Sequence, residues 1–245
     1  MMKKLLSVAM LAALSFAAQA EEGWSGTGEF GLVLSRGNAD TDTLNAKLAL
    51  KHEDESWLHE VAVSALRAEA NDVRTADRFE LGGKSGYKFN ERHYLAGVAR
   101  YENDDFSPYE NQWTVAVTYG VHAINSDATK LTFEIGPGYR RFDPAPFVFS
   151  ETPLIVIDEG SDSEFMMRGF ADFNHKFNDS TSIYNTFLVE SGSDNTFMQD
   201  DIGVLVKMSE ALALKAGFQV RHNNDVPPDA DKTDTLTTIN VVYGF

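Results

Sequence analysis

The feature that most constrains this chain is a recurring run of roughly ten residues in which apolar and polar side chains alternate. Between residues 130 and 142, for example, Leu131, Phe133, Ile135 and Tyr139 occupy every second position or nearly so, and small or polar residues lie between them. A period of two over such a length is typical of a β-strand with one apolar face, not of an amphipathic helix. The pattern therefore predicts an all-β protein.

About twelve such runs can be counted, and we predict one strand for each. The alternation is ambiguous in two of them, 93–101 and 181–189, so ten or fourteen strands remain alternatives. The predicted strands cover residues 24–35, 43–52, 57–66, 78–89, 93–101, 112–124, 130–142, 164–177, 181–189, 197–208, 211–222 and 234–245.

The connections between the predicted strands alternate in length. Those after even strands are tight, at 53–56, 90–92, 125–129, 178–180 and 209–210. Those after odd strands are longer, at 36–42, 67–77, 102–111, 143–163 and 223–233, with a shorter one at 191–196. Outer-membrane barrels combine short periplasmic turns with long outer loops. We therefore predict a transmembrane antiparallel up-and-down β-barrel of about 12 strands, porin-like, in the outer membrane of a Gram-negative bacterium.

Aromatic residues gather at both ends of the predicted strands. Rings of this kind favour the two membrane–water interfaces, so two belts are expected. The chain also ends on an amphipathic strand with a C-terminal Phe245, which resembles the signal that the barrel-assembly machinery recognises. The interface residues that we predict are Trp24, Trp57, Trp113, Tyr139, Phe165, Tyr243 and Phe245.

The first twenty residues have the features of a cleaved secretory signal peptide. Lys3 and Lys4 precede an apolar stretch over 5–18, and 18–20 read Ala-Gln-Ala, a small-x-small cleavage pattern. We expect residues 1–20 to be removed and 21–245 to form one outer-membrane barrel domain. The chain has no cysteine, which excludes disulfides and thiol chemistry.

The chain is strongly acidic, with a formal net charge of −16 at pH 7. Such a charge repels phosphate backbones and argues against nucleic acid as a partner. The predicted long loops carry most of the excess acid, and outer-membrane lipid and lipopolysaccharide, bridged by divalent cations, are the expected partners. Weak calcium binding through Asp40 and Asp42, or through the acids at 158–162, is an alternative. We expect a monomer.

The polar face of the predicted strands is rich in charge and should line the lumen. Eleven cations are assigned to it against five acids, so one-to-one pairing would leave some cations in water. Two interpretations follow: a closed, salt-bridged lumen, or a narrow diffusion channel that mildly prefers small anionic solutes. The anion preference would depend on Lys84, Arg140, Arg168, Lys215 and Arg221. The predicted lumen-lining residues are Lys47, Glu60, Glu80, Lys84, Arg100, Glu134, Arg140, Arg168, Asp172, Asp201, Lys215 and Arg221.

No motif in the chain indicates catalysis, a cofactor or a metal. Gly26, Gly28 and Gly31 match G-x-G-x-x-G, but they lie within a predicted strand, without the following helix that dinucleotide binding requires. No histidine has a serine two residues later and no aspartate precedes a histidine, so the sites of known outer-membrane phospholipases and proteases are missing. We do not expect an enzyme.

The stretch 23–44 carries a resemblance to a known family. It combines Trp24-x-Gly26, an alternating strand, Gly-Asn at 37–38 and Asp-Thr-Asp-Thr at 40–43, with Glu29 on the first strand. Further along, Arg100-Tyr101 and Phe106 are also similar. The chain thus resembles the salt-induced outer-membrane protein family (YdiY-like), β-barrels grouped as a domain of unknown function. The resemblance implies a setting of salt or osmotic stress and supplies no catalytic residues.

Overall fold

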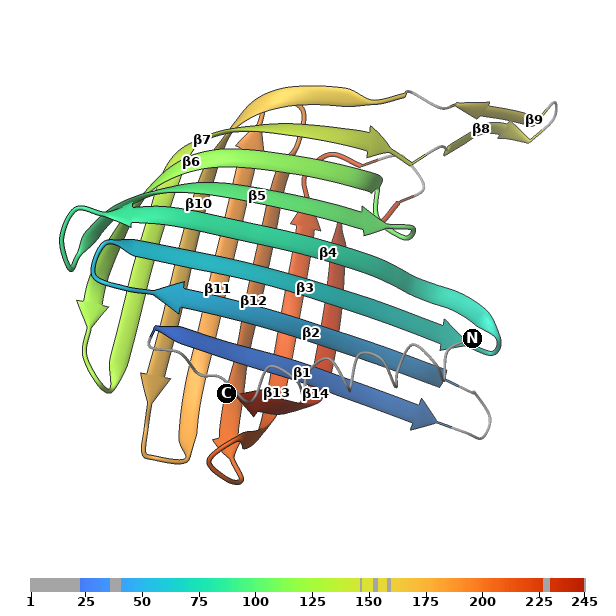
Figure 1. The fold of residues 1–245 in the computed structure, drawn as a ribbon. Helices are drawn as coiled ribbons and strands as arrows, with labels where there is room; N and C mark the ends of the chain where they lie inside the picture. Colours follow the sequence, from blue (N-terminus) through green and yellow to red (C-terminus); the bar gives the residue numbers. More distant parts are fainter. Residues whose placement is uncertain are drawn as a thin grey trace.

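The computed structural model describes residues 23–35, 41–145, 147–151, 154–157, 160–226 and 230–244. Twelve strands form a closed antiparallel barrel, and two short strands form a separate hairpin (Figure 1). The barrel strands are β1 (Trp24–Ser35), β2 (Thr41–Glu53), β3 (Trp57–Ala70), β4 (Val73–Lys88), β5 (His93–Asp104), β6 (Tyr109–Asn125), β7 (Thr129–Pro144), β10 (Asp162–Lys176), β11 (Thr181–Gly192), β12 (Thr196–Lys207), β13 (Leu212–Asn223) and β14 (Thr233–Gly244); the hairpin is β8 (Phe147–Glu151) and β9 (Leu154–Ile157).

Each barrel strand pairs with its neighbours in the chain, and β10 pairs with β7 because the β8–β9 hairpin projects from the connection between them. The pairing of β1 with β14 closes the barrel. The predicted all-β, twelve-stranded, antiparallel up-and-down barrel is therefore confirmed. No helix in the part of the chain that the structure describes is long and apolar enough to span a membrane.

The alternation of side chains sorts the barrel into an apolar outside and a polar inside. Large apolar residues such as Ile135, Val117 and Ile239 are exposed on the outer surface, while their polar neighbours along each strand face the lumen. An exposed apolar band around a closed sheet is the arrangement that hydrocarbon requires, because the ladders pair backbone groups with one another along nearly the whole barrel wall. A small apolar cluster of Leu58, Tyr94 and Ala96 lies on the inner side.

One end of the barrel carries only short turns, and we call it the short-turn end. Each turn begins with a side-chain acceptor that caps backbone N–H groups two or three residues later. Such Asx and Ser turns are a local property of these residue types, and they account for the tight connections that the sequence predicts here. The acceptors are Asp54, Asn90, Ser126, Asn178 and Ser209.

The opposite, long-loop end differs from the prediction in three places. The predicted loop 102–111 has only four residues, since β5 runs to Asp104 and β6 starts at Tyr109. The predicted loop 67–77 is a tight turn, since β3 runs to Ala70 and β4 starts at Val73, with Asn71 and Asp72 at φ values of 51° and 63°. The predicted loop 143–163 contains the β8–β9 hairpin. Strands that continue past the apolar band lose the alternation that marks them in the sequence, so their true ends could not be predicted.

Pro137 lies within β7 without a bulge at that position. The register between β6 and β7 is the same on both sides of it, with Tyr119 opposite Ile135 and Ala116 opposite Gly138. A Cβ at Gly136 would overlap the backbone carbonyl of Val117, so β7 approaches β6 very closely here. Glycine thus permits the close approach beside a proline that cannot donate to the ladder.

The seam that closes the barrel is short. Residues 27–30 of β1 pair with residues 241–244 of β14, which is four pairs, whereas each other neighbouring pair in the barrel has at least eleven. In Figure 1 the two strands meet near the C-terminus and then diverge toward the long-loop end. The upper part of this seam therefore lacks the ladder that joins the rest of the wall.

Candidate functional site: the charged lumen

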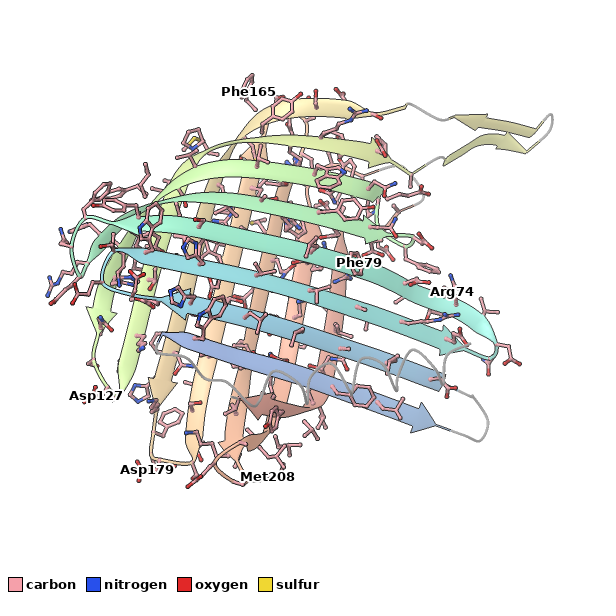
Figure 2. All side chains as sticks on the ribbon, viewed as in Figure 1. Arg74, Phe79, Asp127, Phe165, Asp179 and Met208 are labelled. Carbon is pink, nitrogen blue, oxygen red and sulfur yellow. The ribbon has the colours of Figure 1, made fainter. Side chains whose placement is uncertain are left out.

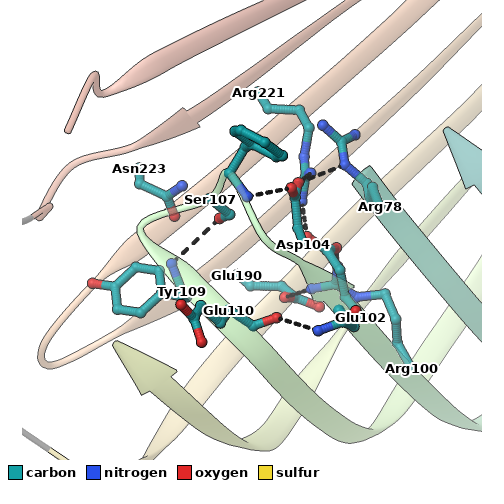
Figure 3. A network of polar contacts seen from close by, with 12 residues as sticks. Arg78, Arg100, Glu102, Asp104, Ser107, Tyr109, Glu110, Glu190, Arg221 and Asn223 are labelled. Atoms are coloured by element: carbon teal, nitrogen blue, oxygen red, sulfur yellow. Dashed lines mark hydrogen bonds and ion pairs between the residues drawn. The ribbon is translucent and has the colours of Figure 1, made fainter. Parts of the chain in front are cut away.

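The lumen is crossed by ion pairs between opposite walls. Arg221 on β13 contacts both Glu102 and Asp104 on β5, which lies six strands away in the closed order of twelve (Figure 3). The Arg221 Nη1 to Asp104 Oδ2 distance is 3.3 Å, and the Arg221 contact with Glu102 is a hydrogen bond from Nη2. All three side chains are buried. The barrel interior is therefore bridged at this level.

Further cations extend this bridge around Glu102 and Asp104. Arg78 on β4 donates to Asp104 at 2.7 Å. Arg100 donates to Glu102 at 2.8 Å and reaches across to Glu190 on β11 at 2.6 Å (Figure 3). Glu102 and Asp104 thus each contact two cations. Buried charge is tolerated when it is paired in this way.

The aromatic ring of Phe197 lies between two of these cations. The Arg100 and Arg221 guanidinium carbons lie 5.4 Å and 5.0 Å from its centroid. Phe197 itself is only 1% exposed. Cation–π contacts of this kind strengthen when desolvated, so the ring contributes to the bridge as well as filling space.

A second group of charges lies closer to the short-turn end. Glu134 on β7 accepts hydrogen bonds from Lys84 at 3.0 Å, from Tyr94 at 2.7 Å and from Arg168 at 3.2 Å. Lys84 also contacts Glu60 at 2.8 Å. Arg168 lies 3.9 Å from Glu190 and so joins this group to the upper one. The two groups together, which we call the lumen network, run from β3 to β13 through the barrel.

Arg140 forms a separate buried pair at the long-loop end. It binds Glu164 on β10 through both Nε and Nη2, and Nη2 also donates to the backbone carbonyl of Asn195 at 2.7 Å. Glu164 in turn accepts from the Asp194 backbone N–H at 2.8 Å. The pair therefore anchors the β11–β12 connection to the inner wall.

The remaining predicted lumen residues surround two cavities. Lys215 binds Glu29 at 3.0 Å and lies 4.5 Å from the centroid of Tyr184, whose hydroxyl donates to Asp201 at 2.9 Å. Lys215, Asp201, Lys47 and Glu80 line a cavity of about 200 Å³. Asp172 lines a smaller one of about 40 Å³, together with Glu60 and Lys84.

The predicted imbalance of charge in the lumen is wrong, because five inward acids were not counted. Four of them were assigned to the outer loops or the strand ends, and Glu29 was overlooked on the first strand. Inward Arg78 was also missed. Glu102 and Asp104 continue the parity of Arg100 on β5, but past the last apolar residue no apolar alternation marks the strand in the sequence. The five acids, Glu29, Glu102, Asp104, Glu164 and Glu190, nearly balance the cations.

The predicted interface aromatics lie on the outer surface at both ends. Trp24 and Trp57 are exposed at the short-turn end, and Trp113 and Tyr139 at the long-loop end. Phe165, which points away from the barrel in Figure 2, is 83% exposed. Tyr243 lies on β14 near its end, and Phe245 falls outside the described residues, as do residues 1–22 with the predicted signal peptide.

Within the described ranges, no three His, Cys, Asp or Glu side chains are grouped as a metal site would require. The alternative calcium ligands Asp40 and Asp158 lie outside those ranges.

Known proteins resemble this chain in fold and, more distantly, in sequence. The translocator domain of the autotransporter NalP from Neisseria meningitidis superposes with a TM-score of 0.54 at 12% identity, over 99% of this chain and 95% of that one. The COG4313 outer membrane channel from Pseudomonas putida F1 gives 0.50 at 10% identity, over 93% and 97%. At such identities these similarities concern the fold alone, which is that of an outer-membrane barrel.

The sequence relatives agree with the resemblance seen in residues 23–44. The uncharacterized protein YdiY of Escherichia coli (strain K12) is 24% identical over 229 residues, which cover 93% of this chain and 86% of YdiY. A family-level profile matches residues 28–245, nearly the whole barrel. The chain therefore belongs to the family described as "Protein of unknown function, DUF481".

Proposed function

We propose that this protein is a structural barrel of the outer membrane whose lumen is closed to passage along its axis by the lumen network. The observation that carries the proposal is the contact of Arg221 with Glu102 and Asp104, since these residues come from opposite walls. A solute moving along the axis would have to separate them.

Separating these pairs is costly. Removing one partner from a buried ion pair typically costs about 3–5 kcal/mol, because the other charge is left uncompensated. Glu102 is fully buried and Arg221 is 5% exposed, so neither is freely hydrated. The alternative role, a narrow channel for small anionic solutes, depended on a surplus of cations that the inward acids largely remove.

Single-channel recording in a planar bilayer tests the closed lumen. We expect the wild-type barrel to be silent in dilute and in concentrated potassium chloride. The double substitution Glu102→Ala/Arg221→Ala should produce discrete openings, because it removes the bridge while Arg100 keeps Glu190 and Asp104 keeps Arg78. The control is Arg74→Ala/Asp77→Ala, which removes an exposed pair at the long-loop end and should stay silent.

Discrete openings of the wild-type barrel would contradict the closed lumen and favour the channel. The reversal potential in a salt gradient would then decide its preference. A chloride preference that falls when Lys84, Arg140, Arg168, Lys215 and Arg221 are replaced by Gln would support the anion channel.

The wider setting of the proposal follows from family and composition. We propose that the barrel resides in the outer membrane after cleavage of a signal peptide and is linked to envelope, salt or osmotic stress. Its partners would be lipid and lipopolysaccharide, bridged by divalent cations, and the barrel-assembly machinery during insertion. The role is non-catalytic and needs no cofactor, and the protein acts as a monomer.

A further inference from the structure

The upper part of the β1–β14 seam leaves backbone groups unpaired. From Gly31 onward β1 is paired only with β2, and from Asn240 back to Thr233 β14 is paired only with β13. Within hydrocarbon such groups must find a partner, and each unsatisfied one costs several kcal/mol. Water from the lumen or a polar ligand can supply these hydrogen bonds, so this part of the wall is the one where the membrane and the lumen can communicate.

A group of side chains links the strands at the lower end of the unpaired part. Asn45 on β2 donates to Asn240 on β14 at 2.9 Å, across Gly31 of the intervening β1. Asn240 also donates to Glu29 at 3.4 Å, and Glu29 binds Lys215 on β13 at 3.0 Å. These four residues, the seam latch, link β2, β1, β14 and β13. The unpaired part of the seam is therefore bounded by the seam latch on the side of the short-turn end.

The larger cavity begins at this latch. Its lining includes all four latch residues together with Leu236 and Thr238, which belong to the unpaired part of β14. Its volume is about 200 Å³, the space of about six or seven water molecules. A compact polar group fits such a space.

Two charged residues in the cavity wall have no direct partner. Within the described ranges, the side chains of Lys47 and Glu80 make no hydrogen bond and no ion pair, while those of Lys215, Glu29 and Arg78 are all paired. Lys47 and Glu80 lie on one row of the sheet, since Lys47 is opposite Ser64 and Ser64 is opposite Glu80. Two strand spacings separate their Cα atoms by about 10 Å. The cavity thus offers one cation and one anion without a direct ion pair, although Glu80 also interacts at longer range with Arg100 and Arg221.

The membrane side of the same opening is apolar. Leu32 on β1 is 52% exposed and Ile239 on β14 is 62% exposed, and continuing the register of the paired residues would place them opposite each other. An apolar chain can lie between them while a polar group enters the cavity.

We propose that the unpaired part of the β1–β14 seam is a lateral portal, and that the cavity behind it binds the zwitterionic head group of a single-chain amphiphile from the membrane. Lys47 contacts the phosphate or carboxylate of the head group, Glu80 contacts its ammonium, and the acyl chain remains outside between Leu32 and Ile239. This site is independent of the closed axis, because the lumen network blocks passage along the barrel and not through its wall.

Native mass spectrometry in a non-ionic detergent tests the site with lysophosphatidylcholine as the probe. We expect one saturable adduct on the wild-type barrel. Lys47→Gln and Glu80→Gln should each weaken it about tenfold, the effect of losing one charge-assisted contact. Lys207→Gln, which changes an inward lysine outside the cavity lining, is the matched control and should bind like the wild type.

Entry of the amphiphile through the wall is tested by cross-linking β1 to β14 across the unpaired part of their seam. Because the chain has no cysteine, Leu32→Cys/Ile239→Cys can be joined by a short bifunctional thiol cross-linker, and the adduct should then be lost. Val204→Cys/Ala216→Cys, tied in the same way across the fully paired β12–β13 seam, should keep it. Soluble phosphocholine should compete poorly, since it has no acyl chain.

Three outcomes would overturn the inference. An equal adduct on Glu80→Gln, Lys47→Gln and wild type would place the amphiphile outside the cavity. An adduct unaffected by tying the seam would remove the portal, and effective competition by free phosphocholine would mean that the cavity is filled from water. None of these outcomes affects the silence expected in the planar bilayer.

Discussion

At the scale of single residues, Arg140 shows what a buried charge requires in this lumen. Its side chain and that of Glu164 are both 1% exposed, so neither ion is compensated by bulk water. Each finds additional backbone partners in the β11–β12 connection. The stability of this end of the barrel therefore depends on both ions being present.

We expect Arg140→Met to lower the free energy of unfolding by about 3–5 kcal/mol, because Glu164 is left as an unpaired buried carboxylate. Arg140→Met/Glu164→Gln should recover a large part of the loss, since no charge is then left unpaired. Urea unfolding of protein folded into lipid vesicles, followed by tryptophan fluorescence, measures both.

The comparison for Arg140 is Arg67→Met, which breaks an exposed pair with Glu69. Exposed pairs contribute about 0–1 kcal/mol, so this variant should unfold nearly like the wild type. Equal losses from Arg140→Met and Arg67→Met would mean that the Arg140 pair is hydrated after all.

At the scale of elements, the turns of the short-turn end each close on one side-chain acceptor. Asp54 is the one carboxylate among the described turn acceptors, and its Oδ1 accepts from Ser56 N at 2.7 Å and Trp57 N at 2.8 Å. The hydrogen bond from the Ser56 backbone N–H, followed by that from Trp57, holds the pKa of Asp54 below its ordinary value. This turn alone should therefore respond to acid.

The sign of the response follows from the lowered pKa. The charged form of Asp54 favours the turn, so its contribution is complete above the ordinary aspartate pKa and is lost as the pH falls through the lowered one. Hydrogen exchange measures how well these backbone amides are protected. The protection of Ser56 and Trp57, divided by that of Arg92 and His93 in the Asn90 turn, should fall as the pH is lowered. Asp54→Asn should remove the response. If this protection ratio stays constant with pH in the wild type, the predicted acid response of the Asp54 turn is wrong.

At the scale of the whole molecule, the barrel combines a nearly continuous ladder with a bridged interior. Eleven of its twelve seams have at least eleven pairs, and the lumen network joins walls that are distant in sequence. Opening any of these eleven seams breaks many ladder hydrogen bonds at once, so we expect the folded barrel to persist in cold detergent.

We expect the protein to fractionate with the outer membrane and to migrate differently on a gel before and after heating in detergent. Its abundance in that fraction should rise when cells are shifted to concentrated salt, if the family resemblance extends to regulation. A protein recovered from the soluble periplasm would contradict the location. An abundance independent of salt would contradict the link to osmotic stress and leave the barrel itself unaffected.

Much of the architecture was available from the sequence. The direction of a side chain on a strand is a local property, so the alternation of Leu131, Phe133 and Ile135 with polar residues was enough to predict the strands and their inward face, with twelve as the count and ten or fourteen as alternatives. The alternating loop lengths then indicated an outer-membrane barrel. The tight connections were also predicted, and their acceptors, such as Asn178, act within three residues. The same local rule failed at the strand ends, because residues beyond the hydrocarbon band have no apolar face to mark them.

What only the tertiary structure decided is which residues meet. Arg221 and Glu102 are 119 positions apart and face one another because twelve strands close into a ring. The alternation shows that a residue points inward only where the strand itself is predicted. It does not show which residue lies opposite on the other wall. The length of the β1–β14 seam likewise depends on how the accumulated stagger of all the strands brings the first against the last. The sequence by itself determined the strands of the barrel wall and which face of each strand points inward. Closure of the strands into a ring decided which charges pair in the lumen and that the β1–β14 seam stays partly unpaired.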